Sequence, residues 1–147
     1  MIVTPGRQEG DPANVALLLT ALGSGANQVQ LVIGPLYHAT SWNGAYLGLF
    51  YGHTLVIMDR FDAAHAVDLI ERHRIEWIFC ASTAMQRIAN LPGVREHDFS
   101  SLRGIASTAA PCPPWLKRAW FDLPKPREDL RALLDDRGHR CHRHPGR

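Results

Sequence analysis

The chain has 147 residues, of which 46% are hydrophobic, and this length suffices for one domain with a hydrophobic core but not for two full-sized domains. The net charge of +2 is uneven: residues 1–123 carry nine Lys or Arg against ten Asp or Glu, and residues 124–147 carry seven against four. A near-neutral body argues against a nucleic-acid-binding surface, which needs basic residues clustered on one face.

Cysteine content and the amino-terminal sequence bear on location. Cys80, Cys112 and Cys141 are too few for a disulfide scaffold and lack paired metal-ligand spacing. The apolar run 15–22 is far shorter than a membrane span, and Pro and Gly interrupt the start before any targeting segment can form. We therefore expect a cytoplasmic protein without a transmembrane segment or a metal site.

Apolar patterning predicts strands and helices in alternation. In chain order, the sequence predicts a helix at 12–22, a strand at 29–33, a helix at 40–52, a strand at 54–58, a helix at 63–74, a strand at 75–80, a helix at 83–90, a strand at 103–107 and a helix at 113–121. This order is typical of an α/β fold, here a partial parallel sheet with flanking helices.

The helix at 63–74 has clear local signals. Asp62 is a good N-cap residue. Asp68 with Arg72, and Glu71 with Arg74, have the spacing of ion pairs on an exposed face. In the preceding helix, the two glycines at 44 and 48 would allow close backbone packing.

Aromatic and polar residues follow the first predicted strand. Tyr37, His38, Thr40 and Trp42 are candidates for lining a pocket, because ligands of parallel sheets bind at the carboxyl ends of the strands. The alternative for His38 is a core histidine bonded to a carbonyl group. Cys80 lies within an apolar run and is expected to be a buried, inert thiol.

A run of small residues, GIASTAAPCPP at 104–114, follows the last predicted strand. Its small side chains would let a flat ring such as a purine approach the backbone closely. An ordinary strand-to-helix connection is the alternative interpretation. The sequence has no Walker-type phosphate loop, no G-x-S-x-G, no H-E-x-x-H and no paired Cys-x-x-Cys motif.

Three long stretches carry a family resemblance: PLYHATSWNGAYLGLFYGHTLVIMDRFDAAHAVDLIERHRIEW, LPGVREHDFSSLR and STAAPCPPWLKRAW. They resemble the middle of the large N-terminal domain of AMP-forming acyl-CoA synthetases, which belong to the adenylate-forming superfamily. The similarity runs from about residue 27 to 122 and is closest to the fatty-acyl and bile-acid-type CoA ligases. The resemblance implies that ATP and a carboxylic acid give an acyl-adenylate, from which CoA displaces AMP.

Site residues follow from this resemblance at matching positions. His38 matches the histidine between the acyl pocket and the nucleotide, and Thr40 and Trp42 would border the acyl pocket. The backbone at Ala109, Ala110 and Pro111 matches the segment that lies against adenine. Two departures from the family pattern are Thr108 in place of glycine and Ser82 in place of proline.

Two motifs of the family are absent from this sequence: the Ser/Thr/Gly-rich phosphate loop and the Tyr-Gly-x-Thr-Glu motif, whose glutamate helps to hold magnesium. We therefore assign no catalytic residue and expect a fragment of an acyl-CoA ligase, concerned with fatty acid metabolism, that does not catalyse adenylation alone. The alternative is a non-catalytic remnant or an adenine- or acyl-binding module.

The domain organisation follows from the extent of the resemblance. Residues 1–122 are expected to form a partial AMP-binding domain, and 123–147 an unrelated, disordered basic tail; metal or RNA binding by its Arg, His and Cys residues is the alternative. Expected partners are a small-molecule acyl substrate and, through exposed sheet edges, other protein chains.

Overall fold

The computed structural model describes residues 24–108, 112–123 and 133–134; the predicted helix at 12–22 and most of the basic tail lie outside them. Five parallel strands form one sheet in the order β2-β1-β3-β4-β5. Their bounds are β1 Val29–Val32, β2 Thr54–Ile57, β3 Trp77–Ala81, β4 Gly104–Thr108 and β5 Leu133–Leu134. The predicted α/β class with a parallel sheet is confirmed.

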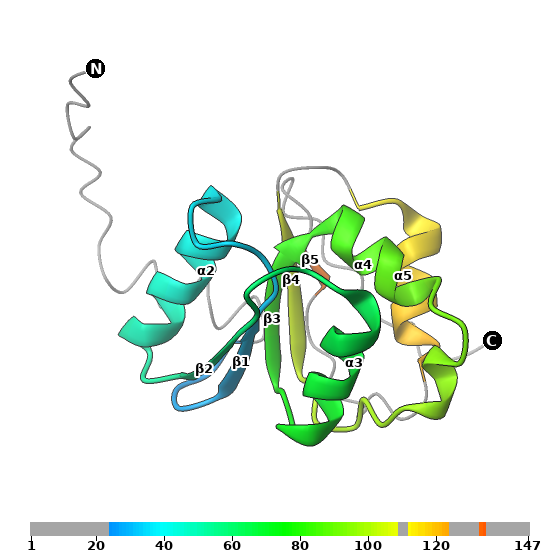
Figure 1. Ribbon diagram of the computed structural model, residues 1–147, viewed down its shortest axis with the longest axis horizontal. Helices are drawn as coiled ribbons and strands as arrows, with labels where there is room; N and C mark the ends of the chain where they lie inside the picture. Colours follow the sequence, from blue (N-terminus) through cyan, green and yellow to red (C-terminus); the bar gives the residue numbers. More distant parts are fainter. Residues whose placement is uncertain (1–23, 109–111, 124–132, 135–147) are drawn as a thin grey trace, which may run out of the picture.

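Helices cover both faces of the sheet. Helix α2 (Ala39–Phe50) lies on one face, and α3 (Ala63–Arg72), α4 (Ser82–Ala89) and α5 (Pro114–Phe121) lie on the other (Figure 1). A short 3₁₀ helix, η1 (Val94–Glu96), precedes β4. Every predicted strand and helix within the described residues is present, with ends displaced by at most two residues.

The main core lies between the sheet and helices α3 to α5. Side chains alternate along each strand, so Leu31 of β1, Ile78 of β3 and Ile105 of β4 all point to this side and are fully buried. Trp120 of α5 donates from Nε1 to the carbonyl oxygen of Met85 at 3.1 Å, which joins α5 to α4. This packing fixes α4, whose first turn borders the site described below.

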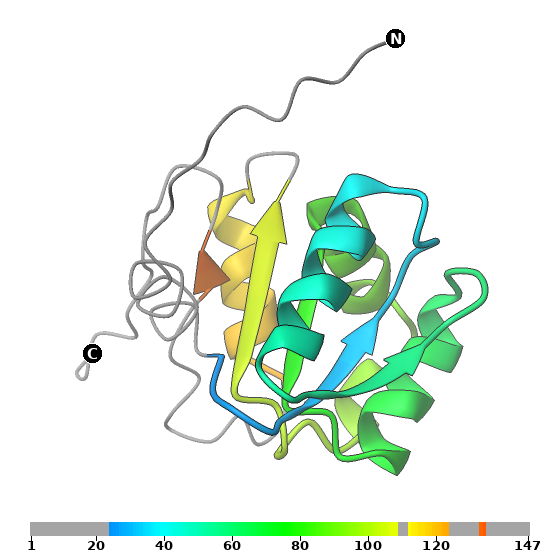
Figure 2. The same cartoon turned by 90° about the vertical axis from the view of Figure 1, so that its left-hand side faces the viewer.

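Helix α2 packs on the opposite face through its small residues. Figure 2 shows α2 lying across the sheet. A Cβ atom on Gly44 would lie 2.8 Å from the Cβ of Phe79 in β3, and one on Gly48 would collide with Oε1 of Gln30 in β1. Gln30 also donates from Nε2 to the carbonyl oxygen of Gly44 at 2.9 Å. The close packing expected of the two glycines is confirmed.

The predicted cap of α3 is confirmed, since Asp62 accepts a hydrogen bond from the backbone N–H of His65 at 2.8 Å. The ion pair between Arg72 and Asp68 is also present, at 2.8 Å.

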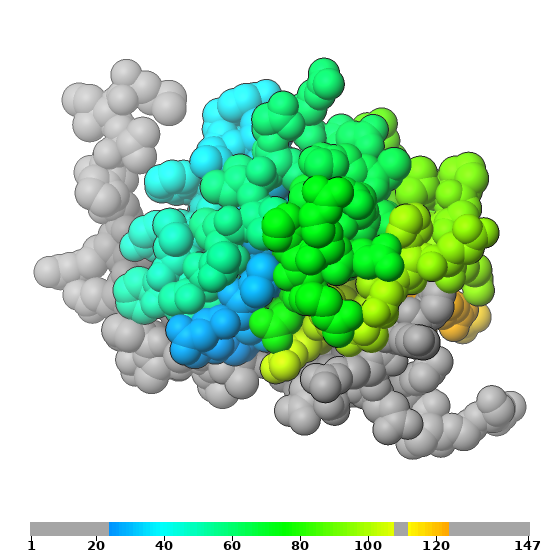
Figure 3. Space-filling model, turned by 60° about the horizontal axis from the view of Figure 1, so that its bottom comes forward, coloured from blue at the N-terminus to red at the C-terminus, as the bar shows by residue number. Residues whose placement is uncertain are grey.

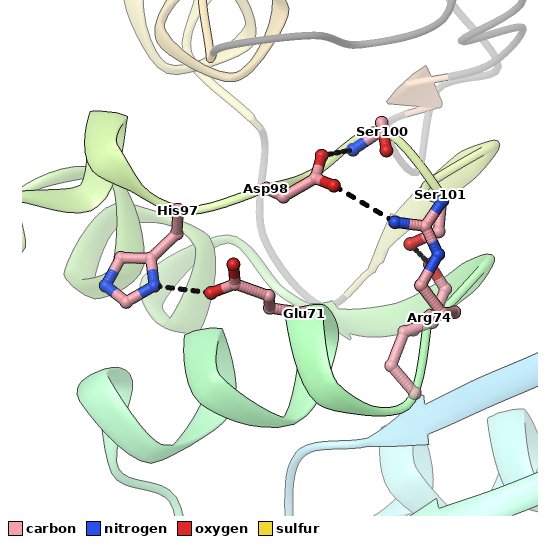
Figure 4. A network of polar contacts seen from close by, with 7 residues as sticks. Glu71, Arg74, His97, Asp98, Ser100 and Ser101 are labelled. Carbon is pink, nitrogen blue, oxygen red and sulfur yellow. Dashed lines mark hydrogen bonds and ion pairs between the residues drawn. The ribbon is translucent and has the colours of Figure 1, made fainter.

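The predicted pair of Glu71 with Arg74 is wrong, because each binds a residue of the segment before β4 (Figure 4). Glu71 contacts His97 at 3.0 Å, and Arg74 contacts Asp98 at 3.0 Å. Arg74 lies beyond the end of α3 with a φ of 53°, so helical spacing no longer sets its direction.

The amino ends of the strands lie at the end of the molecule shown in Figure 3, where the blue start of β1 lies beside the green end of α3. Glu76 joins the start of β1, the start of β3 and the start of β4 there: its carboxylate accepts a hydrogen bond from the backbone N–H of Val29 at 3.2 Å and pairs with Arg103 at 2.9 Å.

Among the helices in the described part of the chain, none has the length and apolar composition of a membrane span.

Candidate functional site: a cavity at the switch point of the sheet

The strand order creates a crevice between β1 and β3. The chain leaves β1 through α2 toward one edge of the sheet, and it leaves β3 through α4 toward the other edge. Because the two helices lie on opposite faces, their first turns diverge above the carboxyl ends of the two strands (Figure 1). Such a topological switch point is where open parallel sheets bind their ligands.

A cavity of about 470 Å³ occupies this crevice. Its size falls within the usual range for small-molecule sites, roughly 300–1,000 Å³. Its walls come from the ends of β1 and β3, the first turns of α2 and α4, and Phe61 between β2 and α3. The lining residues are Ile33, Gly34, His38, Ala39, Thr40, Ser41, Phe61, Phe79, Cys80, Ala81, Thr83, Ala84 and Arg87.

Two of the three residues predicted for the acyl pocket line this cavity. His38 is the N-cap residue of α2, and Thr40 lies in the first turn of the same helix. His38 is exposed rather than buried, so the alternative of a core histidine is wrong. Its ring contacts that of Tyr37, with 4.6 Å between the centroids.

Trp42 lies outside the cavity lining. Its side chain is 57% exposed and stacks on Tyr46, with 6.3 Å between the ring centroids. Trp42 follows Thr40 by two residues, and two residues correspond to about 200° around an α-helix, so the two side chains point in different directions. The contribution of Trp42 to an acyl pocket stays a prediction.

The predicted adenine-facing residues, Ala109, Ala110 and Pro111, lie outside the described residues. The register of the sheet nevertheless locates the start of their loop, because the backbone of Thr108 pairs with that of Ala81, which lines the cavity. Ser107, the residue before Thr108, is buried, and its Oγ has no hydrogen-bond partner in the described structure. The loop therefore begins one strand away from the cavity.

Cys80 forms part of the cavity wall and is almost completely buried. Burial, and to a smaller extent the neighbouring Cys112, raise the pKa of the Cys80 thiol to about 12. A thiol with this pKa is neutral at physiological pH and is a poor nucleophile. The expected buried, inert thiol at Cys80 is confirmed.

Sequence reasoning missed Phe61 and Arg87. Phe61 follows β2, and the guanidinium carbon of Arg87 lies 5.1 Å from the centroid of its ring. The available signal was the spacing of Thr83 and Arg87, which places both on one face of α4. Within residues 24–108, 112–123 and 133–134, no three His, Cys, Asp or Glu side chains gather as a metal site would require.

Comparison with known proteins identifies the family. Residues 13–129 match the AMP-binding enzyme family, and the chain therefore belongs to it. It is 33% identical over 111 residues to 4-coumarate–CoA ligase 3 of Arabidopsis thaliana, covering 75% of this chain and 19% of that protein. It is 32% identical over 122 residues to a feruloyl-CoA synthase of an Amycolatopsis species, covering 82% and 24%. The chain thus spans about a fifth to a quarter of the length of these relatives.

Solved structures show the same fold. A fatty acyl CoA synthetase of Mycobacterium tuberculosis superposes with a TM-score of 0.67 at 19% identity, covering 76% of this chain and 22% of that one. The resemblance to the adenylate-forming family is confirmed by the sequence match, and the fold class by this superposition.

Proposed function

We propose that this chain supplies the acyl-binding part of an AMP-forming acid–thiol ligase. In this proposal a carboxylic acid lies in the switch-point cavity, and ATP and CoA are the co-substrates of the complete reaction. The observation that carries the proposal is the coincidence of His38 and Thr40 with a cavity at the carboxyl ends of β1 and β3. Membership of the AMP-binding family supplies the reaction class.

The chemistry of the walls suits an acid with an apolar body. Ile33, Phe61 and Phe79 provide apolar surface, and burial of such surface favours binding by roughly 25 cal/mol per Å². His38 at the rim carries a ring that can donate a hydrogen bond to a carboxylate oxygen. A fatty, bile or aryl acid satisfies these requirements, so the proposal names the class and not one compound.

The nucleotide would lie beside the acid. In this proposal the backbone at Ala109, Ala110 and Pro111 contacts adenine, and His38 separates the acyl group from the nucleotide. Magnesium would help to neutralise the phosphates, but the described residues offer no set of ligands for it. We assign no step to the metal.

The proposal extends to the rest of the chain. We place the expected boundary between the AMP-binding domain and the tail after residue 134, because the family match runs to residue 129 and β5 pairs with β4. We also place the chain in the cytoplasm, because three cysteines are too few for the disulfide scaffold of an exported domain.

Calorimetric titration of the 147-residue chain with octanoate and with 4-coumarate tests the proposal. We expect saturable binding of at least one acid. His38→Ala should weaken that binding about tenfold, the effect expected for one lost hydrogen bond to a charged group. His73→Ala, at the far end of α3, is the matched control and should change nothing. Absence of binding, or equal effects of the two variants, would contradict the proposal.

Exchange of labelled pyrophosphate into ATP separates a chain that catalyses adenylation from a non-catalytic binding module. Because the sequence lacks the phosphate loop and the Tyr-Gly-x-Thr-Glu motif, we expect no acid-dependent exchange by the chain alone. Acid-dependent exchange would show that the chain is a complete adenylating enzyme.

A further inference from the structure

Arg87 gives the cavity a charge that the proposed function does not use. Its side chain is exposed and lines the cavity from the last turn of α4, beside Phe61. It is the only lysine, arginine, aspartate or glutamate among the residues that form the described lining. A guanidinium group stays protonated at every physiological pH and offers up to five N–H donors.

No carboxylate of the described part of the chain lies within ion-pair distance of Arg87. The ion pairs found there join Arg72 to Asp68, Arg74 to Asp98, His97 to Glu71 and Arg103 to Glu76. The contact of Arg87 with the Phe61 ring holds the guanidinium over an apolar surface without using up its N–H donors. These donors are directed to no acid within the described residues and can bind one from a ligand.

His38 and Arg87 approach the cavity from opposite faces of the sheet. His38 begins α2, on one face, and Arg87 belongs to α4, on the other (Figure 1). A ligand that contacts both must cross the carboxyl edge of the sheet between β1 and β3. Apolar walls connect the two ends, since Ile33 and Phe79 lie at this edge.

We propose that Arg87 is a specificity-determining residue that binds a second carboxylate, and that the preferred substrate class is the dicarboxylic acids with an apolar middle. The inference rests on the proposed function, which assigns the reacting carboxylate to His38. The second carboxylate then lies at the far end of the acid, where it forms a charge-assisted, bidentate pair with the guanidinium.

Suberate and octanoate are a matched pair of probes, because both have eight carbons and differ in one terminal carboxylate. We expect the wild-type chain to bind suberate about tenfold more tightly than octanoate in calorimetric titrations. Arg87→Met keeps an unbranched, flexible stem and removes the charge. It should weaken suberate binding ten- to a hundredfold, the range expected for a lost charged hydrogen bond, and leave octanoate binding within about twofold.

Three further variants complete the experiment. Arg87→Lys retains the charge but lacks the planar guanidinium that binds a carboxylate through two N–H groups. It should keep only part of the preference for suberate over octanoate. Arg118→Met removes an equal charge from α5, outside the cavity lining, and should leave the preference intact. Arg87→Gln replaces Arg87→Met if circular dichroism shows that the methionine variant is misfolded.

Each outcome decides between the two proposals. Binding of octanoate that depends on His38 but shows no preference for suberate overturns the role of Arg87 and leaves the proposed function standing. Equal weakening of both acids by Arg87→Met also overturns it, because Arg87 would then bind the only carboxylate of a monoacid. Failure of both acids to bind the wild-type chain overturns both proposals.

Discussion

Single residues set where the helices begin, as Asp62 does directly after the cavity residue Phe61. Asp62 is the N-cap residue of α3. Its carboxylate accepts a hydrogen bond from the backbone N–H of His65, one of the N–H groups that have no partner within the helix. The sequence predicted this cap because Asp is favoured at the N-cap and an apolar, periodic segment follows it. Local chemistry of this kind depends on neighbouring residues alone and can be predicted from the sequence.

Asp62→Ala should therefore lower the free energy of unfolding by about 1 kcal/mol, the usual cost of a lost N-cap. Urea denaturation followed by circular dichroism measures this. Asp62→Asn keeps an acceptor oxygen and should stay close to the wild type. Equal losses in the two variants would show that the charge of Asp62, rather than its hydrogen bond, stabilises α3.

The buried thiol of Cys80 predicts a dependence of stability on pH. Its pKa is raised from 9.0 to about 12 in the folded chain, mainly by burial. Above pH 9 the thiol ionises in the unfolded chain first, so the folded chain binds more protons and stability falls as pH rises. Its contribution is complete below pH 9 and is lost progressively up to about pH 12, by at most about 1.4 kcal/mol per pH unit.

Urea denaturation of the wild type and of Cys80→Ala between pH 8 and 10.5 isolates this contribution. The difference in unfolding free energy between the two should shrink as pH rises above 9, because alanine has no proton to lose. A constant difference over this range would show that the thiol of Cys80 ionises equally readily in both states.

At the level of elements, α2 shows where the sequence pattern stops being informative. The spacing of Trp42, Ala45, Tyr46, Leu49 and Phe50 correctly predicted a helix, and large apolar residues are usually its buried face. In the structure the four large side chains of this set are 57–72% exposed, and Ser41, Gly44, Ala45 and Gly48 face the sheet instead. The choice of face depends on how closely the backbone of α2 approaches Phe79 and Gln30, which periodicity does not specify.

Gly44→Ala tests this close approach. The added Cβ would lie 2.8 Å from Phe79, so α2 must shift away from β3. We expect a loss of about 1–3 kcal/mol in unfolding free energy, as for other overpacked cores, although alanine is the better helix former by about 1 kcal/mol. Gly25→Ala is the control, since its Cβ would make an ordinary contact of 3.7 Å with Gln28. A stabilised Gly44→Ala variant would contradict the described packing.

Some residues that line the cavity could be predicted from the sequence and others could not. His38 and Thr40 follow β1 directly, so the sequence predicted that they lie at the carboxyl edge of the sheet. Phe61 and Arg87 come from segments after β2 and β3, and they reach the same cavity only because β1 lies between those two strands. This strand order is a property of the assembled sheet, and no local pattern carries it.

At the scale of the whole molecule, the described residues expose large apolar side chains on the side of α2, where Leu49 is 64% and Phe50 72% exposed. Ile57 of the edge strand β2 is 51% exposed as well. Contiguous apolar patches and open strand edges promote association. We propose that the chain self-associates, as expected from its sheet edges.

Sedimentation velocity at increasing concentration measures this association. The double variant Leu49→Lys and Phe50→Lys should shift the chain toward the monomer without lowering its unfolding free energy, because neither side chain is buried. A control with Gln86→Lys and Asn90→Lys adds the same charge at exposed positions near the end of α4. If both double variants reduce association equally, net charge and not the α2 face is responsible.

The central claim is that the switch-point cavity binds a carboxylic acid, and one measurement tests it most directly. Backbone amide shifts of the isotope-labelled chain are recorded by NMR during titration with octanoate, suberate and 4-coumarate. We predict saturable shifts at Gly34, Ser41 and Ala81, around the cavity, and none at Gly25 or Arg74 at the opposite end of the sheet. Shifts confined to the opposite end, or no saturable shift with any of the three acids, would contradict the claim.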